Sequence, residues 1–245
     1  MPEGDSKNLD LIAQTYHIHR TPDHHIEALI QEYEIHWLIG SLQNCNSVVD
    51  LGFGDGIIAP QLAKLFKLTV VEGSKLLAEA AQISLTAVNH QTQVVHTRFE
   101  DFVPAEKVDA VIAAHVLEHV DDPALLMSRI RSWLQPHGRA IVVVPNSHSL
   151  HRRVALEMRL IESLEQLSER DHVVGHQRVF GPDSILELVS SAGFRVEERR
   201  GFFVKPLSNS QMIEWPLDVL AALNRVAECF PFEWCSNLGL VLSRD

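Results

Sequence analysis

The stretch Val48-Val49-Asp50-Leu51-Gly52-Phe53-Gly54-Asp55-Gly56 decides the fold of this 245-residue chain. A short apolar run ends in an acid, glycines follow at alternate positions, and an apolar helical pattern then begins. This order predicts a strand, a tight turn and a helix, because glycine permits positive φ angles and lets a ligand approach the main chain closely.

The charges of the turn distinguish between ligands. A dinucleotide-binding turn reads G-x-G-x-x-G, but position 57 of this chain is Ile57. Asp50 and Asp55 would repel a pyrophosphate, whereas they would attract a ligand that carries an ammonium and a sulfonium group. The turn therefore favours S-adenosylmethionine over NAD. Its acid followed by G-x-G-x-G resembles the first motif of the class I S-adenosylmethionine-dependent methyltransferases.

A second acid agrees with this interpretation. Residues 68–71 predict the second strand, and Glu72 follows it, twenty residues after Gly52. A carboxylate at this place can accept hydrogen bonds from both hydroxyls of a ribose.

The resemblance extends over residues 48–146 and is closest to small-molecule methyltransferases. The string V-L-E-H-V-x-D-P follows the predicted fourth strand, 108–114, and L-x-P-x-G leads into a fifth strand at 139–146. The resemblance implies an α/β fold, a Rossmann-like doubly wound sheet of seven strands. Their order would be 3-2-1-4-5-7-6, with the last strand antiparallel.

We expect a single methyltransferase domain over 1–245, because no Pro/Gly/Ser-rich linker divides the chain. Its parts would be N-terminal cover helices in 1–45, a cofactor-binding core in 46–146, a substrate-covering insertion in 147–180 and the C-terminal part of the sheet in 181–245. The pattern predicts a helix over 154–167 in the insertion. Tyr16 and His19, in a helix over 9–19, could face the site.

The resemblance implies that the cofactor is bound after each of the first four strands. The residues are Asp50, Gly52, Phe53 and Gly54 in the first turn, Glu72, Gly73 and Ser74 after the second strand, Phe99, Glu100 and Asp101 after the third, and His115 after the fourth. In the family the third of these turns wraps adenine. Here a solvated acidic turn is the alternative.

Methyl transfer from a sulfonium needs positioning and, for a hydroxyl or ammonium acceptor, removal of a proton. Histidine has a suitable pKa, and the chain has 14 histidines. His176 lies in a segment similar to the G-H-x-R-x-aromatic element of the family and is the first candidate for the base, before His148 and His119. Each could equally be a loop residue held by hydrogen bonds. The candidates for substrate contacts are His151, Arg178, Asn209 and Gln211.

His115 and His119 are four residues apart, with Glu118 between them, and are the candidate pair for a metal. The pair would fit zinc on a helix, but no third ligand follows at a recognisable spacing. The sequence therefore predicts no metal site.

Composition limits the partners. A net charge of −11 counts against nucleic acid, and no run of eighteen apolar residues indicates a membrane span. Three cysteines without metal-type spacing predict free thiols in a reducing, cytoplasmic compartment.

The expected activity is transfer of a methyl group to an oxygen or nitrogen of a small-molecule acceptor. The alternatives are a peptide or protein acceptor, a non-catalytic partner subunit that retains the fold, and an NAD-linked oxidoreductase. The sequence leaves open whether the protein forms a homodimer.

Overall fold

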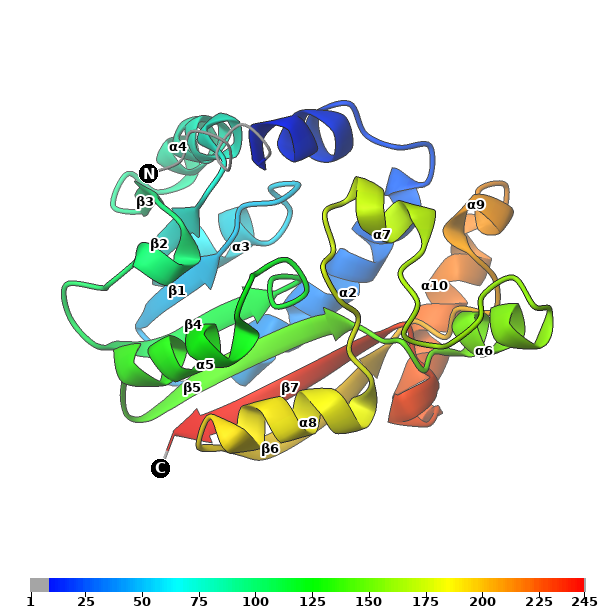
Figure 1. Cartoon of the computed structure of the whole chain (residues 1–245). Coiled ribbons are helices and arrows are strands. Elements are labelled where there is room, and N and C mark those ends of the chain that lie inside the picture. The colour runs from blue at the N-terminus through cyan, green and yellow to red at the C-terminus, as the bar shows by residue number, and fades with distance from the viewer. Residues whose placement is uncertain (1–8, 245) are drawn as a thin grey trace.

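The computed structural model describes residues 9–244 and places a seven-stranded sheet between two layers of helices (Figure 1). The strand order is β3-β2-β1-β4-β5-β7-β6, with β7 antiparallel to both of its neighbours, as predicted. The strands are β1 (Ser47–Leu51), β2 (Lys67–Glu72), β3 (Gln93–His96), β4 (Val108–Ala114), β5 (Leu134–Pro145), β6 (Phe194–Phe202) and β7 (Asn237–Arg244).

The central strands are buried on both faces, which explains their nearly continuous apolar sequences. In β4, Val111 belongs to the core on one side of the sheet and Ile112 to the core on the other. Both side chains have no exposed surface.

Helices on the two faces complete these cores. The helices α5 (Pro123–Trp133) and α8 (Pro182–Ser191) pack on one face. The other face is covered by α2 (His24–Ser41), α3 (Ala59–Ala63), α4 (Lys75–Val88) and α10 (Leu217–Val226). The remaining helices lie in the connections: η1 (Ala13–Ile18), η2 (Phe99–Asp101), α6 (Leu150–Glu157), α7 (Glu169–Val173), α9 (Asn209–Met212), η3 (Ala227–Cys229) and η4 (Phe232–Trp234).

The parallel strands β1, β2, β4 and β5 all end at the same edge of the sheet. The N-terminal helical segment 9–18 and helix α7 lie beyond this edge (Figure 1). Segments distant in sequence therefore meet where an open α/β sheet binds its ligand.

The predicted helix over 154–167 is wrong. Helix α6 ends at Glu157, and Arg159 has a φ of +57°, which a right-handed helix cannot contain. The Nε of Arg152 donates a hydrogen bond to the carbonyl of Leu164 at 2.9 Å, which holds the following loop in a non-helical path. The fifth strand begins earlier than predicted, because Leu134 pairs with Val108.

Within the described range 9–244, no helix combines the length and the apolar character needed to cross a membrane.

Candidate active site

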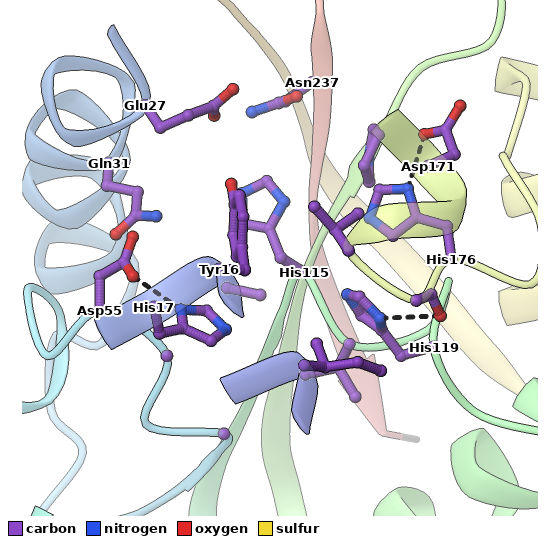
Figure 2. Close-up of a pocket in the computed structure, with 18 of the residues that line it drawn as sticks. Tyr16, His17, Glu27, Gln31, Asp55, His115, His119, Asp171, His176 and Asn237 are labelled. Atoms are coloured by element: carbon purple, nitrogen blue, oxygen red, sulfur yellow. Dashed lines mark hydrogen bonds and ion pairs between the residues drawn. The ribbon is translucent and has the colours of Figure 1, made fainter. Parts of the chain in front are cut away.

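A cavity of about 650 Å³ lies at the carboxyl ends of the parallel strands. This is the size of a typical small-molecule site. The glycine turn and Glu72 line one end. His115 and His119 after β4, and His176 in the loop after helix α7, line the other (Figure 2). Both ends open into one continuous space.

The glycine turn has the backbone conformation that its sequence predicts. Gly52 and Gly54 have φ angles of +89° and +53°, a region in which other residues are strained. A Cβ on Gly56 would lie 2.8 Å from the ring of Phe53. The third glycine therefore makes room for the Phe53 ring.

Glu72 joins the turn to the end of β2. Its Oε2 accepts a hydrogen bond from the N–H of Phe53, and its Oε1 accepts one from the N–H of Ser74, each at 2.8 Å. The carboxylate is fixed with its remaining lone pairs available to the cavity, as a ribose-binding acid requires.

Asp50 is buried at the end of β1 beneath the turn. Burial, and then the charge of Glu72, raise the pKa of Asp50 to about 8. The protonated form of Asp50 is therefore favoured at pH 7, and a cationic ligand would favour its ionisation. Asp50 is therefore not the permanent negative charge that the sequence suggests, and it attracts a cationic ligand as it loses this proton.

The turn after β3 differs in part from the prediction. Phe99 lines the cavity, but Glu100 and Asp101 do not, and neither does Gly73. Glu100 lies 3.7 Å from the Nε of Arg98, and Asp101 is exposed. Glu100 and Asp101, the acids predicted to bind adenine, therefore do not face the cavity.

The N-terminal segment covers the cofactor end of the cavity. The Nδ1 of His17 lies 2.6 Å from a carboxylate oxygen of Asp55 in the glycine turn. Asp10 accepts a hydrogen bond from the hydroxyl of Ser74 at 2.6 Å. Tyr16 lines the cavity as expected, whereas His19 does not.

His115 lies at the junction of β4, α2 and β7. Its φ is +56°, and its Nε2 lies 3.0 Å from Oε2 of Glu34, whose other oxygen accepts a hydrogen bond from the side chain of Asn237 at 2.7 Å. Burial alone would lower the pKa of His115, but the charge of Glu34 and contacts with Glu118 hold it well above its ordinary value.

Beside His115, two further histidines, His119 and His176, face the cavity (Figure 2). Both lie close to the buried Glu118. The rings of His119 and His176 meet edge to face with centroids 4.7 Å apart. His176 bonds through Nδ1 to Asp171 at 2.8 Å, and Nδ1 of His119 lies 3.3 Å from the carbonyl of Gly175. The sequence named both histidines as candidates, and the fold brings them together.

The pKa values of this group depend on one another. Burial lowers the pKa of His119, which favours a neutral ring. Burial alone would raise the pKa of Glu118, but the neighbouring histidines hold it below its ordinary value. Hydrogen bonds from His176 and Ser168 likewise outweigh burial and lower the pKa of Asp171. The group therefore combines neutral imidazole with ionised carboxylates.

A family model described as a methyltransferase domain matches residues 13–199. The chain belongs to this family. It is an S-adenosylmethionine-dependent methyltransferase.

Relatives of this methyltransferase match it over most of their length. The ubiquinone biosynthesis O-methyltransferase of Cupriavidus pinatubonensis is 25% identical over 239 residues, which are 93% of this chain and 93% of that protein. The protein with the same name from Rickettsia typhi is 24% identical, covering 82% of this chain and 80% of its own.

Solved structures agree in fold. The N-methyltransferase NodS from Bradyrhizobium japonicum, in complex with S-adenosyl-l-homocysteine, has a TM-score of 0.58 at 15% identity and covers 88% of this chain and 87% of its own. An S-adenosylmethionine-dependent methyltransferase from Mesorhizobium loti has a TM-score of 0.62 at 15% identity. The match covers 86% of this chain and 96% of that protein.

Besides Gly73, Glu100 and Asp101, four residues predicted as catalytic or substrate contacts of the methyltransferase do not line the cavity, and each has another role. Arg178 binds the carbonyls of Leu117 and Val120, and so supports the loop that carries the histidines. His148 lies 3.1 Å from Glu165, Asn209 binds Glu27, and Gln211 caps its own short helix. His151 lines the cavity, and burial holds its pKa well below the ordinary value.

Several lining residues escaped the sequence analysis. Lys205, after β6, lines the cavity and has no hydrogen bond or ion pair with any residue in the described part of the chain. Burial lowers its pKa. Arg170 also lines the cavity but is paired with Asp23 and Glu27. Neither Lys205 nor Arg170 belongs to one of the motifs, so no signal in the sequence indicated that they line the cavity.

Proposed function

We propose that this methyltransferase transfers the methyl group of S-adenosylmethionine to a hydroxyl oxygen of a small molecule bound at the histidine end of the cavity. One observation carries the proposal: the glycine turn and the rings of His119 and His176 face a single cavity. O-methyltransferase relatives that match along nearly the whole chain support oxygen as the acceptor atom.

In this proposal the cofactor lies between the glycine turn after β1, near Asp50, and Phe99 in the turn after β3. Glu72 accepts hydrogen bonds from the ribose hydroxyls, since both of its oxygens retain a free lone pair. The ammonium group of the cofactor lies near Asp50, and the adenine lies against Phe99. The methyl group then points toward His115 and His119 at the end of β4.

The chemistry needs little beyond alignment and removal of a proton. The acceptor oxygen attacks the methyl carbon as the carbon–sulfur bond breaks, and S-adenosylhomocysteine leaves as a neutral thioether. A hydroxyl is a poor nucleophile until it loses its proton. The ring of His119, which burial keeps neutral, and the ring of His176 beside it stand where they would assist that loss.

Lys205 supports an acceptor that carries an anionic or oxygen-rich group. It is a cation in the cavity without a partner among the described residues, and a ligand oxygen would satisfy it. The net charge of −11 supports a small acceptor over nucleic acid. The free thiols Cys45, Cys229 and Cys235 support a cytoplasmic location.

The test is a product assay with matched acceptor pairs. Hydroxylated benzoates and the corresponding aminobenzoates would be incubated with the protein and S-adenosylmethionine, and S-adenosylhomocysteine and methylated product measured by mass spectrometry. We expect methyl ethers from the hydroxyl series and no activity in Glu72→Ala. Methylation of only the amines, or of neither series, would contradict the proposal.

A further inference from the structure

We propose that Glu118, His119 and His176 form a binding site for one divalent transition-metal ion, which binds the acceptor hydroxyl. The role of the ion in catalysis rests on the proposed function, whereas its binding does not. The sequence predicted no metal site because no third ligand follows His119 at a recognisable spacing. The fold supplies that ligand from the segment after α7.

The three side chains are close enough to share an ion. One donor atom from each lies within 4.8 Å of those of the other two, and Nε2 of His176 is 4.0 Å from Oε1 of Glu118. Bond lengths of about 2.0–2.2 Å in a tetrahedral zinc site place donors roughly 3.4 Å apart. Side-chain movements of about 1 Å would therefore close the site around an ion.

Both histidines are oriented as metal ligands usually are. The Nδ1 of His176 donates to Asp171, and the Nδ1 of His119 donates to the carbonyl of Gly175 (Figure 2). A ring that donates through Nδ1 keeps a lone pair on Nε2. Carboxylates and carbonyls are the outer partners that fix this tautomer in metal sites.

Glu118 lacks the partners that a buried carboxylate needs. It has no exposed surface, and neither of its oxygens accepts a hydrogen bond from any residue of the described chain. The Nδ1 of His115 is 3.7 Å away, but the same ring already serves Glu34, which is also fully buried. Two buried carboxylates thus share one imidazole, and a cation would balance the remaining charge.

The donor set and its position indicate the kind of ion. Two imidazoles and one carboxylate suit zinc, iron or another first-row metal, whereas magnesium prefers oxygen ligands. His119 and His176 line the cavity, and Glu118 lies beneath them. An ion held there would keep a coordination position open toward the acceptor.

That open position would serve the methyl transfer. A hydroxyl bound to the ion has a lowered pKa and releases its proton to water, as metal-bound water does. The oxygen then forms its bond to the methyl carbon, the electron pair of the carbon–sulfur bond goes to sulfur, and the charge of the ion is unchanged. The ion would therefore replace a general base.

The first test is binding of Zn²⁺ to the metal-free protein by calorimetry, with Co²⁺ absorption spectra alongside. We expect one equivalent bound by the unaltered protein and by His172→Asn, a matched control because His172 is exposed on the same short helix as Asp171. Glu118→Gln and His176→Asn should bind at least tenfold more weakly. All four should keep their affinity for S-adenosylhomocysteine, which shows that they are folded.

Three results would overturn the metal site. These are no zinc binding by the unaltered protein, equal binding by Glu118→Gln and His176→Asn, or a Co²⁺ spectrum with the strong thiolate absorption that Cys45, Cys229 or Cys235 would give.

The catalytic role has a separate readout. Chelation should abolish methylation of the hydroxyl acceptor, and Zn²⁺ should restore it; methylation that survives complete removal of metal would overturn this role. If zinc binds as expected but no hydroxyl is methylated with or without it, the proposed function fails and the metal site stands.

Discussion

Glu34, in the middle of helix α2, accepts a hydrogen bond from His115 at the end of β4, with 3.0 Å between Oε2 and Nε2. The same carboxylate accepts from Asn237 of β7 at 2.7 Å. Three elements distant in sequence are thus joined beneath the cavity by one buried acid.

Removal of this acid should destabilise the fold. We expect Glu34→Ala to lower the free energy of unfolding by about 2–4 kcal/mol, because it removes the buried acceptor of the hydrogen bonds from His115 and Asn237. Urea denaturation would measure the change. Glu32→Ala, on the exposed side of the same helix, should stay within about 0.5 kcal/mol of the unaltered protein; equal effects of the two substitutions would contradict the role of Glu34.

Cofactor binding should release a proton from Asp50. Its pKa is about 8, and a bound ammonium group would favour the ionised form. Titration with S-adenosylhomocysteine at pH 7, in buffers of different ionisation enthalpy, should show release approaching one proton. Asp50→Asn should bind more weakly and release none. Equal proton release by both proteins would remove Asp50 from the ammonium site.

The raised pKa of Asp50 also sets a pH dependence of stability. Between pH 4 and 8 the folded protein holds a proton at Asp50 that the unfolded chain has lost, because the pKa rises from 3.8 to about 8 on folding. The contribution of this residue to the free energy of unfolding therefore falls as pH rises through that range. Melting curves recorded from pH 4 to 8 should show this decline in the unaltered protein and not in Asp50→Asn. A parallel decline in both proteins would contradict the contribution of Asp50.

Gly56→Ala should damage both the fold and cofactor binding. The φ of Gly56 is +70°, and a Cβ would lie 2.8 Å from the ring of Phe53, whose N–H binds Glu72. We expect a loss of about 1–2 kcal/mol from the backbone conformation, with weaker binding of S-adenosylhomocysteine. Gly40→Ala, in α2 with nothing within 4 Å of the new Cβ, should instead gain roughly 0.5–1 kcal/mol.

Lys205→Met should affect the acceptor and spare the cofactor. If Lys205 binds an anionic group, its loss should raise the KM of the acceptor about 10- to 100-fold, as expected for a hydrogen bond to a charged group. Steady-state kinetics and calorimetry with S-adenosylhomocysteine would separate the two effects. The exposed Lys107→Met is the control. An unchanged KM would exclude Lys205 from the acceptor site.

The sequence predicted the sheet and the cofactor turn because both are encoded locally. The run from Val48 to Gly56 contains its own strand and turn signals, and Glu72 follows at a fixed distance set by one strand, one helix and the next strand. The strand order followed from the resemblance and is confirmed.

Long-range contacts account for what the sequence analysis missed. No periodicity in α2 shows that Glu34 will meet His115, since the contact depends on how the helix crosses the sheet. Arg178 was a candidate for substrate contact because it lies in the segment similar to the G-H-x-R-x-aromatic element of the family, but it binds backbone carbonyls instead. The bend at Arg159 requires a positive φ at a residue that rarely adopts it, which no helical pattern could indicate.

The antiparallel strand β7 has a consequence for the order in which the protein folds. β6 pairs only with β7, and β7 reaches β5 in a register that joins Arg139 to Ser243, across about a hundred residues of chain. β1 and β2, by contrast, pair Ser47 with Lys67 over a single helical connection. Because closing long loops is slow, the half of the sheet that carries the glycine turn should assemble first. The half that supplies Lys205 and Asn237 then docks against the open edge of β5.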